Sequence, residues 1–444
     1  MTFSLQRRME KSRIRKSARF KKDIISELPQ NLKETILCLL PIRDAVRTAI
    51  LSRDWRHCWT TIPQLAFDDI FLDSVWDNYL EHFHDEELKM LKFVSVINKV
   101  ILLHNGPILK FSLSCPQDID NDTLVFQDYI DQWIPLLSRN GIKQLTIEGF
   151  MSEHSTALNF SSLNLTHLRL VDFWFPYTPA SGGLTCLKYL ELIDVVIAEE
   201  HVFDCPVLEK LTLVNCEGLF RMNFRAPHLK YFHQLVSFMT PEISLAGLQN
   251  LIQYSFWLSR DAIVHTKAFN VVKVLSCLPK IEKFSVGMNF IKYLAAGGAP
   301  NRLHEPLLYL KTLGIYDINL TDVNEVSTLL CLIQSSPNLC KLHIKDTKEG
   351  DLEDYWKKVS QKSIGDHLKI VIFSHFRGLK AELELVQFLL GHSPLLKTMF
   401  IHCGQDINKD VALAAAEEML RFPRASTRAE IKHLEHVVED IYSI

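Results

Sequence analysis

Side chains that could carry out chemistry are sparse in this chain of 444 residues. His82-Phe-His84, followed by Asp85 and Glu86, combines residue types that bind metal ions, but no further ligand stands at the spacing that zinc sites use. We therefore interpret this cluster as a solvated polar patch. The sequence contains no glycine-rich phosphate loop, no Gly-x-Ser-x-Gly and no His-Glu-x-x-His. We predict no catalytic residue, metal or cofactor, and interpret His375 and His392 as ordinary surface or core residues.

A pattern suited to binding rather than catalysis lies in residues 23–69. Three short runs there place apolar side chains at helical spacing, and Pro41 and Ser52 separate them. Pro29 suits the first turn of a helix, and Pro41 cannot continue one. A bundle this small has too little interior to hide all of its apolar side chains. We expect the remaining apolar face to meet another protein or the rest of the chain.

The same segment resembles an F-box, and most closely the plant type. Residues 40–46 read Leu-Pro-Ile-Arg-Asp-Ala-Val, and residues 55–59 read Trp-Arg-His-Cys-Trp. The resemblance implies docking on the Skp-family adaptor of a cullin-based (SCF) ubiquitin ligase. It assigns to the adaptor-binding F-box Leu28, Pro29, Leu32, Ile36, Leu37, Leu40, Pro41, Val46, Leu51, Trp55 and Trp59.

Several of these residues also suit the core of a three-helix unit, and the two roles are compatible. We expect Leu28, Pro29, Ile36 and Leu37 to contact the adaptor. The two tryptophans, Trp55 and Trp59, are expected to tie the F-box to the chain that follows.

From there a Leu-x-x-Leu-x-Leu motif, or a close variant, repeats along the chain. It begins at Ile108, Ile142, Leu165, Leu187, Leu208, Leu229, Leu251, Ile281, Leu310, Leu339, Leu368 and Leu396. The interval lengthens from about 22 to about 29 residues, close to the period of leucine-rich repeats. Each unit must stack on its neighbours to bury its leucines. We predict an α/β leucine-rich-repeat solenoid in two sections, the later one with longer helical backs.

Residues beside the last two leucines of a motif should face the concave side of such a solenoid. Aromatic and cationic side chains displayed in this way suit protein recognition, although each one alone is more simply a solvated residue of the sheet. No cluster of Arg and Lys is apparent among them. The candidate substrate-binding residues are His167, Arg169, Tyr189, Glu191, Lys210, Thr212, Tyr231, His233, Lys341 and His343.

Four further segments resemble sequence motifs of the same group of plant proteins. Cys-Pro-Val-Leu-Glu at 205–209 and Ala-Pro-His-Leu-Lys-Tyr at 226–231 resemble the repeats of plant F-box proteins. Ser-His-Phe-Arg-Gly at 374–378 and Arg-Phe-Pro-Arg-Ala at 421–425 resemble the FBD domain. The expected organisation is a basic, disordered arm at 1–22, an F-box at 23–69, leucine-rich repeats at 70–360, and an FBD-like segment with a C-terminal cap at 361–435.

The distribution of charge and the cysteine pattern limit which partners and which cellular compartment we expect. The net charge is −3, but residues 1–22 carry nine basic residues against Glu10, a local +8, which leaves −11 for the rest. This balance gives no support to nucleic-acid binding, and no apolar run approaches the roughly 20 residues that span a bilayer. The ten cysteines form no Cys-x-x-Cys pair, which favours a reducing compartment. We expect the nucleus and/or the cytoplasm, with the basic arm either an import signal or a solvated terminus.

The resemblance implies a non-catalytic subunit that recognises a substrate for an SCF-type E3 ubiquitin ligase, binding a Skp-family adaptor, through it cullin, and an unknown protein substrate. Two alternatives stay open. One is an F-box-type co-receptor for a small, hormone-like molecule, which would need a pocket lined by several cationic residues. The other is an adaptor-bound scaffold that does not lead to degradation.

Overall fold

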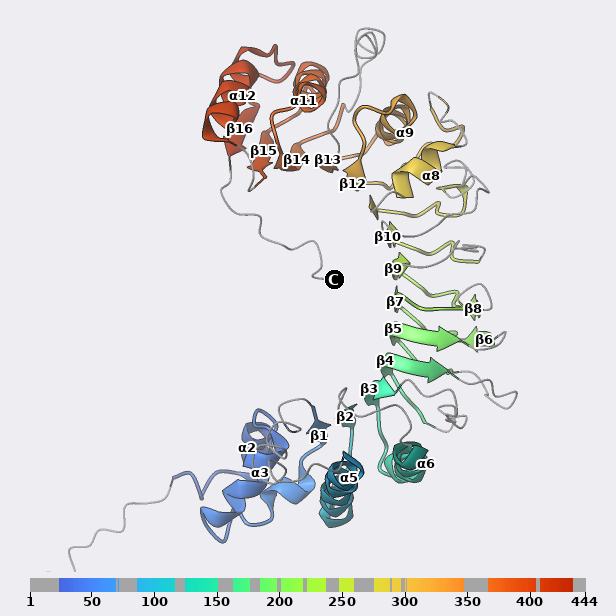
Figure 1. Cartoon of the computed structure of the whole chain (residues 1–444), viewed down its shortest axis with the longest axis vertical. Coiled ribbons are helices and arrows are strands. Elements are labelled where there is room, and N and C mark those ends of the chain that lie inside the picture. The colour runs from blue at the N-terminus through green and yellow to red at the C-terminus, as the bar shows by residue number, and fades with distance from the viewer. Residues whose placement is uncertain are drawn as a thin grey trace, which may run out of the picture. The chain divides into compact units, whose positions relative to one another are not determined.

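The computed structural model describes residues 24–68, 71, 86–115, 124–150, 163–175, 184–197, 201–218, 222–236, 247–258, 275–287, 290–296, 300, 302–346, 366–404 and 408–433. The basic arm and the His82-Phe-His84 cluster with Asp85 lie outside these residues. The chain divides into two compact units, Met1–Thr146 and Ile147–Ile444, and each is described by itself. Figure 1 labels the helices and strands of both.

The first unit begins with short helices that proline residues start. Helix α2 (Gln30–Leu37) has Pro29 as its N-cap, and α3 (Ile42–Arg47) has Pro41 in the same place. A 3-10 turn, η1 (Thr48–Ile50), follows. The prediction of a third helix, on the run from Leu51 to Trp59, is wrong. Residues 51–57 form turns, and His57 (φ −117°, ψ 2°) leaves helical geometry before the 3-10 helix η2 (Cys58–Thr61).

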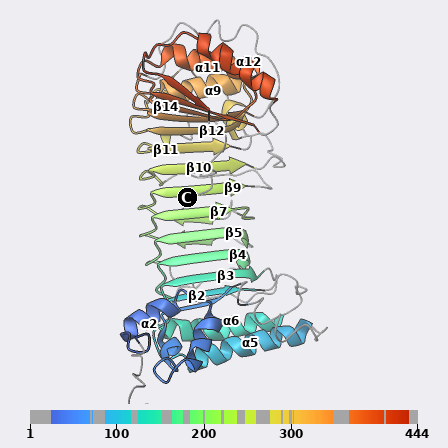
Figure 2. The same cartoon turned by 90° about the vertical axis from the view of Figure 1, so that its left-hand side faces the viewer.

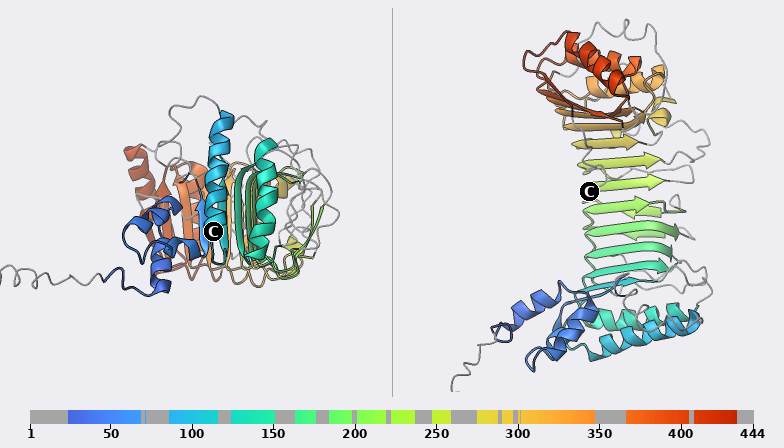
Figure 3. Two further views of the ribbon diagram at one scale, coloured as in Figure 1. Left: turned by 90° about the horizontal axis from the view of Figure 1, so that it is seen from below. Right: turned by 60° about the vertical axis from the view of Figure 1, so that its left-hand side comes forward.

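The remainder of this unit combines strands with two longer helices. It contains β1 (Gln64–Phe67), α5 (Glu86–Leu103), β2 (Lys110–Ser114) and α6 (Leu124–Arg139), and β1 pairs with β2 in parallel. Figure 3 shows α5 and α6 running along these strands. Strand β3 (Gln144–Phe150) crosses the division between the units.

The second unit is a ladder of parallel strands in sequence order. The order is β4 (His167–Phe175), β5 (Tyr189–Ile197), β7 (Lys210–Val214), β9 (Tyr231–Val236), β10 (Gln253–Leu258), β11 (Lys283–Gly287), β12 (Thr312–Ile318), β13 (Lys341–Asp346), β14 (Ile370–Phe376), β15 (Thr398–Cys403) and β16 (Glu430–His433). Figure 2 shows these strands stacked with a common direction.

The leucine motif sets the position of every one of these strands up to β15. Each begins two residues after the first apolar residue of a motif: β5 starts at Tyr189 after Leu187, and β7 at Lys210 after Leu208. Leu187 and Leu208 are 0% exposed, as are the equivalent residues of most other motifs. Burial then alternates along the strand, as a two-residue side-chain period requires. The predicted solenoid of leucine-rich repeats is confirmed.

Different elements pack behind the core-facing side of the sheet in the earlier and the later repeats. Behind the earlier repeats lie the short strands β6 (His201–Asp204) and β8 (Met222–Arg225), which pair with each other. Behind the later repeats lie α8 (Phe290–Ala296), α9 (Val323–Gln334), α11 (Lys380–His392) and α12 (Lys409–Arg421), all on the outer side in Figure 1. Phe256 of β10 and Phe290 of α8 pack at 4.2 Å between ring centroids. The step to longer repeats therefore coincides with helical backs, as predicted.

The opposite side, which we call the concave face, carries the first and third residue of each strand. Apolar residues at the second and fourth positions turn towards the core, so the alternation leaves the first and third residues on the open side.

Five residues of the ladder, in or just after a strand, lie in the left-handed backbone region, which the sequence pattern did not reveal. Asp172, Asp194, Asn215, Asp317 and His375 have φ between 46° and 61°, and each stands seven residues after the first residue of its motif. Asp, Asn and His tolerate this region better than most side chains. At Asp317 and His375 the strand register also shifts. In β4 and β5 the strand pairing resumes at the next residue, Phe173 and Val195.

Leu37 and Leu39 provide a matched test of the F-box core. Leu37 is 0% exposed and Leu39 is 81% exposed. Leu37→Ala should lower the free energy of unfolding by about 2–5 kcal/mol, because it removes buried methyl groups and leaves a cavity. Leu39→Ala should change it by less than about 0.5 kcal/mol. Urea denaturation of the full chain, followed by tryptophan fluorescence, measures both. Equal effects of the two substitutions would contradict this packing.

Candidate interaction surfaces

The first surface is an apolar face on residues 24–51. Leu32 and Ile36, one helical turn apart on α2, are 46% and 40% exposed. Leu39, Ile50 and Leu51 are more exposed still, at 81%, 86% and 67%. Scattered exposed leucines are ordinary on soluble proteins, but apolar side chains gathered on one small domain mark a contact surface. The expected surplus of apolar surface is therefore present.

The predicted adaptor-binding residues divide between this face and the core. Pro29, Leu32, Ile36, Leu40 and Leu51 are exposed, and Leu28, Pro41 and Val46 are half-buried. Leu37, Trp55 and Trp59 are buried. The side chain of Leu37 is fully enclosed in this structure, so it offers no surface to an adaptor unless the helix repacks on binding.

Trp55 has a clear packing role. Its ring lies 5.7 Å from Lys33 Nζ, and Lys33 itself is 6% exposed, a cation–π arrangement. Helix α2 is also held by Thr61, whose Oγ1 donates to Glu34 Oε1 at 2.7 Å. These contacts fix the helix that presents Leu32 and Ile36.

The second surface is the concave face, where strand pairing brings the predicted substrate-binding residues into two rows. His167, Tyr189, Lys210 and Tyr231 are register partners in succession, and so are Arg169, Glu191, Thr212 and His233. The rings of His167 and Tyr189 stack at 4.4 Å. Lys341 and His343 lie on β13, with four strands between them and β7. All ten candidates are exposed or half-buried.

Charges at the beginning of this face neutralise one another. Arg169 Nη1 lies 2.8 Å from Glu191 Oε1, and Arg169 Nε lies 3.2 Å from Glu148 Oε1 on β3. These two carboxylates raise the pKa of Arg169, outweighing the opposing effect of its partial burial. Arg169 and Glu191 therefore stabilise the local sheet surface and are less available to a partner than their residue types suggest.

Strands β10 to β12 contribute residues that the sequence interpretation missed. Applying the same position rule to the motif at Ile281 places Lys283 on the concave face, and Lys283 is exposed. Partial desolvation and the nearby Lys341 ammonium lower the pKa of Lys283. The sequence interpretation included Lys341 but not Lys283, and these two ammonium groups, two strands apart, repel each other. The motif spacing alone could have identified Lys283.

Tyr316 links this region to His343 through a chain of hydrogen bonds. Tyr316 Oη and His343 Nδ1 are 2.9 Å apart, and His343 Nε2 and Ser374 Oγ are 2.7 Å apart. Desolvation, aided by Lys341, His402 and Lys345, lowers the pKa of His343 to about 4. His233 behaves in the same way, with a pKa of about 4 because of burial and the Lys210 charge. Both imidazoles are therefore neutral near pH 7.

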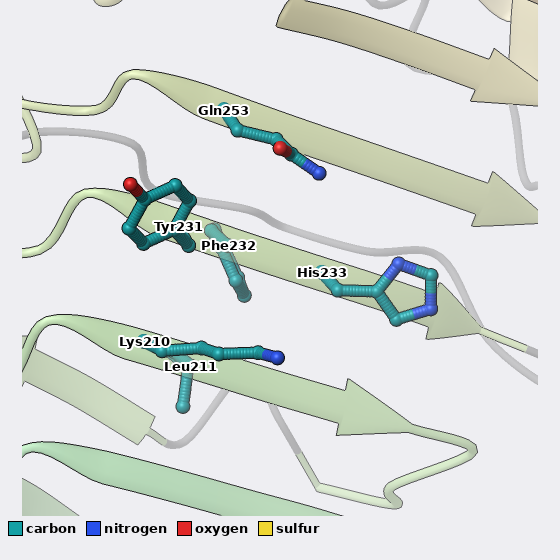
Figure 4. A pocket seen from close by; sticks show the side chains of 6 residues that line it. All are labelled: Lys210, Leu211, Tyr231, Phe232, His233 and Gln253. Atoms are coloured by element: carbon teal, nitrogen blue, oxygen red, sulfur yellow. The ribbon is translucent and has the colours of Figure 1, made fainter. Parts of the chain in front are cut away.

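A shallow recess opens around His233. It is lined by Lys210, Tyr231, His233 and Gln253, with Leu211 and Phe232 beneath, and is too shallow to enclose a water molecule. Figure 4 shows Lys210, Tyr231 and Gln253 on three successive strands, with Lys210 extended along its strand. The recess suits contact with an extended chain better than enclosure of a small molecule.

Within the described ranges, no group of three or more His, Cys, Asp or Glu side chains is arranged to hold a metal ion. None of the helices in the same ranges combines the length and apolarity needed to cross a bilayer. His375 is exposed at the end of β14, and His392 Nδ1 lies 2.9 Å from the Phe388 carbonyl oxygen at the end of α11.

Family models match three parts of the chain. An F-box domain model matches residues 25–65, a model of the LRR repeats of FBD-associated F-box protein At5g56370 matches residues 130–344, and an FBD model matches residues 362–401.

Individual relatives extend the match over most of the chain. F-box/FBD/LRR-repeat protein At1g13570 of Arabidopsis thaliana is 34% identical over 93% of this chain and 99% of its own length. Two further Arabidopsis thaliana proteins, putative F-box/FBD/LRR-repeat protein At3g59240 and FBD-associated F-box protein At1g66310, are each 25% identical. They cover 88% and 92% of this chain, and 85% and 95% of their own lengths.

The two neutral histidines predict a pH dependence of stability. Unfolding returns each pKa from about 4 to 6.5, so between these values the unfolded chain binds more protons than the folded one. The free energy of unfolding should therefore fall as pH decreases from 6.5 to 4, by on the order of 3 kcal/mol per histidine at most. Urea denaturation at several pH values measures this.

The double variant His233→Gln/His343→Gln should flatten this part of the pH profile, while His304→Gln, at an exposed position, should leave it unchanged. An unaltered slope in the double variant would contradict the assignment.

Proposed function

Because the chain belongs to the F-box/FBD/LRR-repeat proteins, we propose that it is the substrate-recognition subunit of an SCF-type E3 ubiquitin ligase. Its F-box binds a Skp-family adaptor and, through it, cullin. The concave face of its leucine-rich repeats binds a protein substrate. The chain is a non-catalytic subunit.

The observation that carries this proposal is the apolar face on residues 24–51. Leu32, Ile36 and Leu51 are exposed although their spacing is that of core residues. Burial of a Leu or Ile side chain in an interface contributes about 1.5–3 kcal/mol. Contacts of this kind, made by a helix already fixed through Thr61 and Trp55, would support stable docking of an adaptor.

The subunit would accelerate ubiquitination by proximity. A substrate held on the same scaffold as a charged ubiquitin-conjugating enzyme meets it at a raised effective concentration, without any bond chemistry in the subunit itself. The polar and aromatic character of the concave face is consistent with recognition of a protein surface, where Tyr and Arg are enriched. Tyr189 and Tyr231, both 40% exposed, are the aromatic side chains displayed there.

Removing the apolar face tests adaptor docking. Leu32→Ala/Ile36→Ala should raise the Kd for a purified Skp-family adaptor at least tenfold, a loss of about 1.4 kcal/mol or more. Isothermal titration calorimetry with the full chain measures this. Because both side chains are substantially exposed, the variant should keep its fold, which circular dichroism verifies.

The control is Leu102→Ala/Leu103→Ala on α5, where the side chains are 77% and 57% exposed. It removes the same kind of surface away from the predicted interface and should leave the Kd unchanged. An adaptor that binds the Leu32/Ile36 variant as tightly as the parent chain would refute the docking proposal.

A further inference from the structure

Three lysines form a row on the concave face between β7 and β13. Lys210, Lys283 and Lys341 are the first residues of β7, β11 and β13. The first residues of the strands between them are Tyr231, Gln253 and Thr312, which carry no charge at neutral pH. We call Lys210, Lys283 and Lys341 the lysine row.

The carboxylates near the lysine row form ion pairs with other lysines. Glu209 pairs with Lys230 at 3.0 Å, and Glu282 pairs with Lys311 at 2.8 Å, both one residue before a strand. Asp317 lies 3.9 Å from Lys345. Among the described residues, no carboxylate makes an ion pair with a lysine of the row. This part of the concave face therefore carries a surplus of positive charge in a chain whose net charge is −3.

The charges of the row are also unfavourable to one another. Partial desolvation and the Lys341 ammonium lower the pKa of Lys283. A bound anion would relieve this repulsion, because an opposite charge within about 4–6 Å favours the protonated amines. The row is thus poised to gain electrostatic energy from a negatively charged partner.

Small residues stand beside the lysine row, at the third and fifth positions of β11 and the third position of β12. A Cβ on Gly287 would stand 2.4 Å from the Trp257 ring, and one on Gly314 would stand 2.8 Å from the Tyr316 ring. The two glycines therefore let these rings lie across the strands, where their centroids are 4.8 Å apart. Ser285 adds only a small, buried side chain. These small residues, together with the shallow recess at Lys210 and His233, suit contact with an extended chain.

We propose that the lysine row binds an extended acidic segment of the client protein, an inference that rests on the proposed function and specifies its partner. Adjacent strands lie about 4.8 Å apart, so Lys210 and Lys283 are about 14 Å apart and Lys283 and Lys341 about 10 Å. An extended chain advances about 3.3–3.6 Å per residue. Along an extended chain the two distances correspond to about four and then about three residues.

A defined peptide tests this proposal with the full chain. The probe is a fluorescein-labelled ten-residue peptide with Glu at positions 1, 5 and 8 and Gly or Ser elsewhere, measured by fluorescence anisotropy at low salt. Lys283→Gln/Lys341→Gln should raise its Kd at least tenfold. The same peptide with Gln in place of Glu should bind the parent chain at least tenfold more weakly than the acidic one. Binding should also weaken with added salt, as exposed charges require.

The matched control is Lys292→Gln/Arg421→Gln, which removes the same charge from exposed positions on α8 and α12. It should bind the acidic peptide like the parent chain. Equal affinity of parent and Lys283/Lys341 variant, equal loss in the control, or equal affinity for the Glu and Gln peptides would each overturn the proposal.

Adaptor binding of the Lys283/Lys341 variant is measured in parallel, because it separates this inference from the proposed function. Unchanged adaptor affinity with lost peptide binding supports the lysine row. If the adaptor binds but peptide binding does not depend on the lysines, the proposal for the lysine row is refuted and the proposed function is not. Failure of the parent chain to bind the adaptor counts against the ligase assignment instead.

Discussion

The inward leucines of the repeats are the constraint on which the second unit depends. Each motif places buried residues at fixed positions, and the strands of the ladder from β4 to β15, which do not include β6 and β8, start two residues after the first of them. Because side chains alternate along a strand, a register error of one residue would turn the leucines out and the polar residues in. The hydrophobic cost of such an error keeps successive strands in step. The same register lines up residues from distant parts of the sequence on the concave face.

Repetition therefore produces both the core and the binding surface. Lys283 and Lys341 are 58 positions apart in the sequence, yet only β12 stands between their strands. Their mutual repulsion arises from the stacking of repeats rather than from any local motif. In the F-box the situation is different, because the exposed Leu32 and Ile36 are neighbours on one helix. The two surfaces thus differ in chemistry as well as in origin: one is apolar and helical, the other polar, aromatic and cationic. Charge on the second favours selectivity and fast encounter over raw affinity.

The period of the leucines was enough to predict the solenoid, the strand positions and the change to helical backs. Other features depend on contacts that periodicity does not encode. Leu37 shares its helical pattern with Leu32 and Ile36, and only the packing of α2 against η2 shows that Leu37 is the buried member. Trp55 and Trp59 have helical spacing, but turns and a 3-10 helix suffice to bury both. The left-handed residues such as Asp194 and Asn215 follow the motif regularly, yet Asp and Asn are also common in ordinary loops. Lys283 was within reach of the motif rule, whereas its coupling to Lys341 required the sheet.

The central claim is that one chain holds an adaptor through its F-box and an acidic client segment through its repeats, at the same time. The direct measurement is a sandwich assay in which an immobilised Skp-family adaptor captures the chain and a labelled Glu-containing peptide is then added. The parent chain should be captured and bind the peptide without leaving the adaptor. The lysine-row variant should be captured equally but bind no peptide, and the Leu32/Ile36 variant should not be captured. The claim would be contradicted if the peptide displaced the chain from the adaptor, or if the adaptor-bound chain did not bind the peptide.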